Sequence, residues 1–143
     1  MNENPLADPP PPADPLPCET IVYRAAMDET WFSEDKTEVD AIAFHRRERR
    51  DPSGLTIGLH DRFYRGTLLR PIAGVISIHV GHVRDVGNEL GVELDVVVDA
   101  DPHGNIVGLP FAKSPTRKEA ERIASLLARR TSRPHEVFDP PRL

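Results

Sequence analysis

Three short apolar runs in the middle of the chain constrain the fold more than any other feature of the sequence. They cover residues 75–80, 92–98 and 106–109, and apolar and polar side chains alternate along the first two. Because successive side chains of a strand point to opposite faces of a sheet, this alternation predicts half-buried strands. The connection at 99–105 is rich in turn-forming residues, so it predicts a hairpin between the second and third runs.

The flanking segments complete a predicted α+β domain with a five- to six-stranded, largely antiparallel curved sheet. Residues 20–25, 38–45 and 55–59 are interpreted as further strands, the last two paired with each other. Residues 82–91 contain glycine and asparagine, which predict a loop or one helical turn. One C-terminal helix, at 114–130, is predicted to pack on the sheet, because its apolar residues recur at helical spacing after a capping-box sequence.

Length and composition limit the kind of protein that this can be. The 143 residues correspond to one domain, which we place at 18–143, behind a Pro-rich segment at 1–17 that is predicted to be disordered. This segment is interpreted as a spacer, with a docking ligand of PxxP spacing as the alternative. The net charge of −5 argues against a protein dominated by contacts with phosphates. A single cysteine, Cys18, cannot form an internal disulfide, and no apolar run is long enough to span a bilayer. We therefore expect a soluble, cytoplasmic protein without membrane contact.

Four polar side chains form a candidate ligand-binding site: Arg24, His60, Ser77 and His79. Each falls on the face opposite to the apolar set of its own predicted strand. If these strands are neighbours, the arginine and the two imidazoles would form a cationic pocket for a phosphate or a carboxylate. The pocket is the basis for one alternative, a small enzyme that acts on a nucleotide or phosphate compound.

The pair Tyr23-Arg24 on an early strand is similar to a Tyr-Arg pair in ADP-ribosyltransferase-like enzymes. In those enzymes the arginine helps to hold the dinucleotide. The similarity covers two residues, and neither a hydroxyl-rich strand nor a well-placed catalytic glutamate follows in this sequence. The resemblance therefore adds a dinucleotide to the ligands to be tested.

Two features are candidate contacts with a partner. The most basic segment carries Arg46, Arg47, Arg49 and Arg50. It is interpreted as a solvated loop, with contact to nucleic acid or an acidic partner as the alternative. Trp31 is interpreted as a residue of the core or its rim, with an exposed partner anchor as the alternative.

The sequence contains no complete motif for binding a metal or a cofactor. His79 and His82 would point to opposite faces of a continuous strand and could not share an ion. Asp99 and Asp101 begin a spacing like that of a calcium loop, but Pro110 occupies the place of its bidentate acid. We predict no metal and no cofactor, and no phosphate loop or nucleophile elbow occurs. The sequence favours a non-catalytic binding or accessory module that acts through a protein partner, whose identity it does not reveal.

Overall fold

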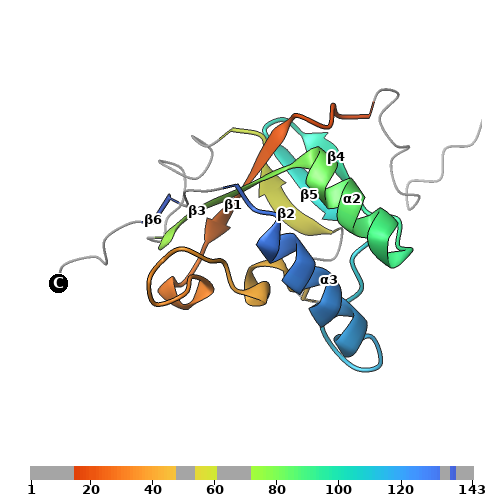
Figure 1. Cartoon of the computed structure of the whole chain (residues 1–143). Helices are drawn as coiled ribbons and strands as arrows, with labels where there is room; N and C mark the ends of the chain where they lie inside the picture. The colour runs from red at the N-terminus through yellow and green to blue at the C-terminus, as the bar shows by residue number, and fades with distance from the viewer. Residues whose placement is uncertain (1–14, 48–53, 61–71, 133–135, 138–143) are drawn as a thin grey trace, which may run out of the picture.

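The structure, a computed structural model, describes residues 15–47, 54–60, 72–132 and 136–137. Within them the chain forms one open sheet with the order β4-β5-β2-β1-β3-β6, and all neighbouring strands are antiparallel (Figure 1). The strands are β1 (Ile21–Ala26), β2 (Leu55–Gly58), β3 (Gly74–His79), β4 (Asp95–Ala100), β5 (His103–Val107) and the two-residue β6 (Glu136–Val137). The predicted antiparallel α+β architecture is confirmed, including a hairpin between β4 and β5. Its turn is shorter than the predicted connection at 99–105, because β4 continues to Ala100 and β5 begins at His103.

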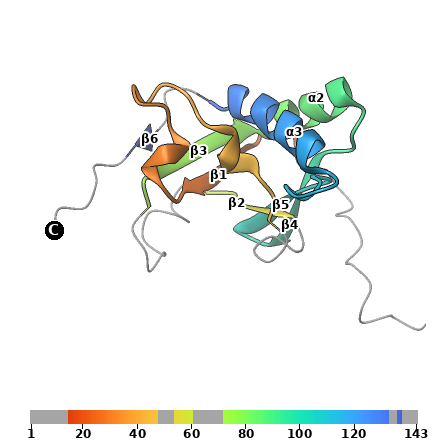
Figure 2. The same cartoon turned by 90° about the horizontal axis from the view of Figure 1, so that it is seen from below.

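Helices cover one face of this sheet (Figure 2). The described part of the chain contains α2 (Val80–Leu90), α3 (Arg117–Arg129) and the short 3-10 helices η1 (Glu29–Trp31) and η2 (Ala41–Phe44). α3 packs against η2 and α2, and the main core lies between this helical layer and the sheet. Its largest fully buried side chains include Phe44, Leu55, Ile57, Ile76, Ile106, Ile123 and Leu127. Among the helices that the structure describes, none combines the length and the apolar character needed to cross a membrane.

The prediction of a loop or single turn at 82–91 is wrong, because this segment lies in α2. Buried side chains recur at every third position of the helix: Val80, Val83 and Val86. The glycines that suggested breaks have other roles. A Cβ on Gly87 would lie 2.5 Å from the carbonyl oxygen of Val92, so close approach of the chain requires glycine there. Gly91, at φ 68°, ends the helix in the left-handed conformation that glycine adopts readily.

The prediction of a strand at 38–45 is also wrong. The carboxylate of Asp40 accepts a hydrogen bond from the backbone N–H of Ile42, and this cap starts η2. The side chain of Phe44 is then buried in the core instead of alternating across a sheet. Consequently β2 does not pair with this segment but lies between β1 and β5.

The predicted C-terminal helix is confirmed as α3, which begins at Arg117 with Thr116 as its N-cap residue. The predicted capping box does not form its side-chain bond, because the Thr116 hydroxyl donates backwards to the carbonyl oxygens of Phe111 and Lys113. The proposed tail lies outside the described residues as far as residue 14. Of its last residues, Leu16 packs against the main core.

Candidate functional site

Arg24 lies on the face of the sheet that the helices cover. The register pairs it with Ile76, and its alternate neighbours on β1, Val22 and Ala26, are fully buried in the main core. The sequence prediction placed Arg24 on the face opposite to the core, and this is wrong. Both alternate sets of β1 contain apolar residues, so alternation alone did not reveal which set is buried.

The guanidinium of Arg24 connects three parts of the fold. It donates hydrogen bonds to the carbonyl oxygen of Ala43 in η2 and, at 2.8 Å, to that of Thr56 in β2. Its carbon Cζ also lies 5.4 Å from the ring centre of Trp31, within the range of a cation–π contact. β1 and β2 are paired at a single position, so few backbone hydrogen bonds join them. The bond from the guanidinium to the Thr56 carbonyl oxygen adds a link between these two strands. Arg24 therefore acts as a structural clamp.

Ser77 lies on the other face of the sheet, away from the helices. His79, the last residue of β3, instead contacts α2, because its ring centre lies 5.2 Å from that of His82. The register pairs Ser77 with Tyr23 and His79 with Ile21, and side chains opposite each other in such pairs share a face. Nδ1 of His79 lies 3.4 Å from the hydroxyl of Ser132, which follows α3. The placement of Ser77 opposite the core-facing side chains of β3 agrees with the sequence prediction. The expectation that His79 and His82 point to opposite faces of one strand is wrong, because β3 ends at His79 and α2 begins at Val80, which brings the two rings together.

His60 lies beyond the end of β2. Its Nε2 is 3.7 Å from a carboxylate oxygen of Asp101 in the β4–β5 turn, and both side chains are exposed. The four residues of the predicted pocket therefore do not converge: the sheet separates Arg24 from Ser77, His79 packs against His82, and His60 lies beside Asp101. Whether any of them binds a ligand stays a prediction.

Trp31 lies in the core, with 9% of its surface exposed, and the neighbouring Phe32 is buried as well. The interpretation of Trp31 as a core residue is confirmed. The alternative, an exposed anchor for a partner, stays a prediction, and the small exposed surface of the indole argues against it.

The basic segment is partly used inside the fold. Arg46 donates a 2.9 Å hydrogen bond to the carbonyl oxygen of Leu109, and its Cζ lies 4.2 Å from the ring centre of Phe111. It thereby holds the chain that precedes α3. Arg47 is exposed, and positions 48–53, which include the other two arginines, lie outside the described residues.

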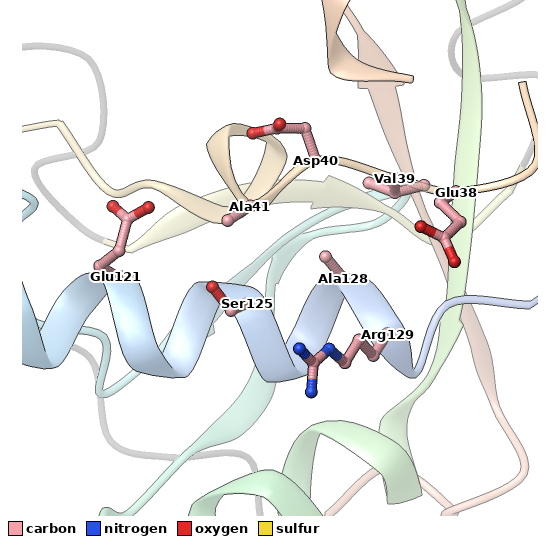
Figure 3. Close-up of a pocket in the computed structure, with 8 residues that line it drawn as sticks. All are labelled: Glu38, Val39, Asp40, Ala41, Glu121, Ser125, Ala128 and Arg129. Carbon is pink, nitrogen blue, oxygen red and sulfur yellow. The ribbon is translucent and has the colours of Figure 1, made fainter. Parts of the chain in front are cut away.

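A groove lies between α3 and residues 38–44, which we call the η2 segment (Figure 3). Its volume is about 650 Å³, within the usual range for binding pockets. It is lined by Glu38, Val39, Asp40, Ala41, Glu121, Ser125, Ala128 and Arg129. Figure 3 shows Ser125 and Ala128 pointing from α3 toward the η2 segment. Small side chains therefore line the part of α3 that faces this segment.

Three carboxylates line the groove: Glu38, Asp40 and Glu121. Figure 3 shows Glu121 near one end, directed from α3 toward the η2 segment, and Glu38 near the other end, directed toward α3. Oε2 of Glu121 lies 2.9 Å from Nε2 of His45, the residue that ends η2. Arg129 is the basic residue of the lining, and its guanidinium is directed across the outer side of α3, away from the η2 segment (Figure 3). The groove therefore presents negative charge.

A second polar cluster lies at the β4–β5 hairpin. Nδ1 of His103 is 2.6 Å from Oδ1 of Asp99, and the amide of Asn105 donates to Oδ2 at 3.2 Å. Burial raises the pKa of Asp99, but the hydrogen bonds from His103 and from the backbone N–H of Ala100, with the charge of the imidazolium, lower it overall below 3.8. This arrangement fixes the imidazole against the hairpin.

No protein-family model, curated protein or solved structure matches this chain. Within the described ranges, no three His, Cys, Asp or Glu side chains are grouped so that they could hold a metal ion.

The groove was not predicted from the sequence. Its two walls are separated by about eighty positions along the chain, and its carboxylates carry no motif. One signal was present in the sequence: Lys118, Arg122, Ser125 and Arg129 recur at i, i+4, i+7 and i+11 on the polar side of the predicted helix. That stripe borders the groove on α3, but the sequence does not show that the η2 segment lies beside it.

Proposed function

We propose that this protein is a non-catalytic binding module that holds a cationic segment of a partner protein in the groove between α3 and the η2 segment. The observation that supports this function is the combination of negative charge and small side chains in one groove. Glu38, Asp40 and Glu121 line it together with Val39 and alanines. Such a surface complements side chains that carry a positive charge on an apolar stem.

Lysine and arginine suit the groove in two respects. Their methylene stems can lie on Ala41 and Ala128 while their charged groups reach the carboxylates. Exposed ion pairs contribute about 0.2–1 kcal/mol each, so Glu38 and Glu121 support selective but weak binding. The Asp40 carboxylate caps η2 and is directed away from α3 in Figure 3. Because such pairs are screened by salt, we expect the affinity to fall as ionic strength rises.

The small-enzyme alternative receives less support from the arrangement of its candidate residues. Arg24 donates to two backbone carbonyl oxygens on the helix-covered side of the sheet, whereas Ser77 lies on the other side and His79 packs against His82 of α2. An anion held by either β3 side chain would lack the guanidinium on which that alternative depends. The enzyme and the nucleic-acid alternatives stay predictions.

Fluorescence anisotropy with labelled peptides tests the proposed function. We expect a Lys- and Arg-rich peptide to bind at low salt and a Glu-rich peptide of equal length not to bind. The double variant Glu38→Gln and Glu121→Gln should weaken binding by roughly 2- to 25-fold, since it neutralises two carboxylates. Glu119→Gln, an exposed change in the first turn of α3 outside the groove lining, is the matched control. Equal binding of both peptides, or equal loss in the control, would contradict the proposal.

A further inference from the structure

α3 carries an exposed basic ridge directly beside the acidic groove. We define this ridge as Lys118, Arg122, Ser125 and Arg129. Its three cationic residues are exposed, and in the part of the chain that the structure describes none of them forms an ion pair or hydrogen bond with another residue. The ridge is opposite to the buried stripe of Ile123 and Leu127, so it faces outward. The protein therefore displays the kind of cationic segment that its own groove would accept.

The ridge and the groove share Ser125 and Arg129, and their charges are arranged with a simple symmetry. Glu121 lies four residues before Ser125, and Arg129 lies four residues after it. In an α-helix each interval corresponds to about 6 Å along the axis. If two α3 helices crossed antiparallel about a two-fold axis at Ser125, each Glu121 would face Arg129 of the other copy. Such an interface is isologous, because the same patch meets itself.

We propose that the cationic segment that this groove receives is the α3 ridge of a second copy of the chain, in an antiparallel pair centred on Ser125. The inference rests on the proposed function, since it names the partner of the same groove. It is supported by the charge complementarity of groove and ridge. It is also supported by the small side chains of Ser125, Ala128 and Ala41, which allow close approach.

The same register pairs the remaining charges favourably. Arg122 of the second copy falls opposite Ala128, and Figure 3 shows Glu38 beside that position. Lys118 of the second copy falls opposite position 132, just beyond the carbonyl end of α3, where the helix dipole favours a cation. The contacts are exposed ion pairs over a small area, so the dimer is weak and strongly dependent on salt.

Sedimentation velocity of the full chain over a range of concentrations, at low and high salt, tests this interface. The wild type should form dimers at low salt and dissociate at high salt. Arg129→Glu and Glu121→Arg should each weaken self-association at least about tenfold, because each places like charges opposite one another. Arg117→Glu, which changes an exposed arginine outside the groove and the ridge, should leave the dimer unchanged.

Mixing the two charge-reversal variants gives the sharpest result. The positive charge introduced at position 121 of one variant would then face the negative charge introduced at position 129 of the other. The second contact of the pair would keep the native Glu121 and Arg129, so a heterodimer should form where neither variant dimerises alone. Arg122→Glu, at an exposed position, is a further reversal if either variant is poorly folded. A wild type that stays monomeric at every concentration and salt, or dimers unaffected by the reversals, would overturn the inference.

Peptide binding separates this failure from failure of the proposed function. A monomeric wild type that still binds the cationic peptide would overturn self-association alone. A monomeric wild type that binds no cationic peptide would overturn both. Competition between the peptide and the second copy, seen as dissociation of the dimer on adding peptide, would support both.

Discussion

Replacing Arg24 with methionine should destabilise the fold by about 3 to 6 kcal/mol. Methionine keeps an unbranched stem of similar length but donates no hydrogen bond. Hydrogen bonds with one charged partner contribute about 1.5–3 kcal/mol each, and the bonds from Arg24 to the carbonyl oxygens of Ala43 and Thr56 are of this kind. The substitution also removes the cation–π contact with Trp31. Arg24→Lys keeps the charge but loses the planar fork, so it should recover less than half of the loss.

Urea denaturation followed by circular dichroism measures this effect, provided that the slope of unfolding free energy against urea is unchanged. Arg122→Met, on the exposed side of α3, is the control and should change the free energy of unfolding by no more than about 0.5 kcal/mol. A loss below about 1 kcal/mol for Arg24→Met would refute the reasoning that the guanidinium joins η2 to β2.

Two further changes test the core and the hairpin cluster. Ile123→Asp puts a charge at a fully buried position and should lower the free energy of unfolding by at least about 3 kcal/mol. The control Arg122→Asp, at an exposed position, should lower it little. Equal shifts in melting temperature for the two variants would contradict the packing of α3. The pKa of Asp99 is lower in the folded protein than its value of 3.8 in the unfolded chain. The ionised Asp99 carboxylate therefore stabilises the fold above pH 3.8, and this stabilisation is lost as the pH falls through the folded-state pKa. Asp99→Asn should therefore melt below the wild type at neutral pH, and the difference should shrink at about pH 3. A constant difference would argue against this linkage.

Much of the sheet could be predicted because its signal is local. Ile76 and Ile78 are buried in the core while Ser77 between them is partly exposed, as the alternation predicted. The stripe of Ile123 and Leu127 likewise predicted the helix that became α3, because side chains three or four residues apart share one helical face.

The errors arose where a distant part of the chain decides the local conformation. Gly87 reads as a helix breaker in isolation, but the close carbonyl oxygen of Val92 explains why glycine belongs inside α2. In β1, Val22 and Ala26 are buried while Ile21 is exposed, and both sets are apolar. The inward face was therefore decided by the neighbouring strands and helices, and the position of Arg24 followed from it.

The groove depended still more on tertiary structure. Glu38 and Glu121 are ordinary surface carboxylates in the sequence, and they come to line one groove only when α3 packs against η2. The basic ridge of α3 was visible as a helical pattern. Its role as a contact surface is suggested only by the acidic groove beside it, which the sequence does not reveal.

An amide NMR titration of the nitrogen-labelled full chain with a Lys- and Arg-rich peptide tests the central claim most directly. We expect the chemical-shift changes to concentrate on the groove, at Val39, Ala41, Ser125 and Ala128, and to disappear at high salt. Changes centred on Ser77 at the opposite face of the sheet, or no changes at any peptide concentration, would contradict it.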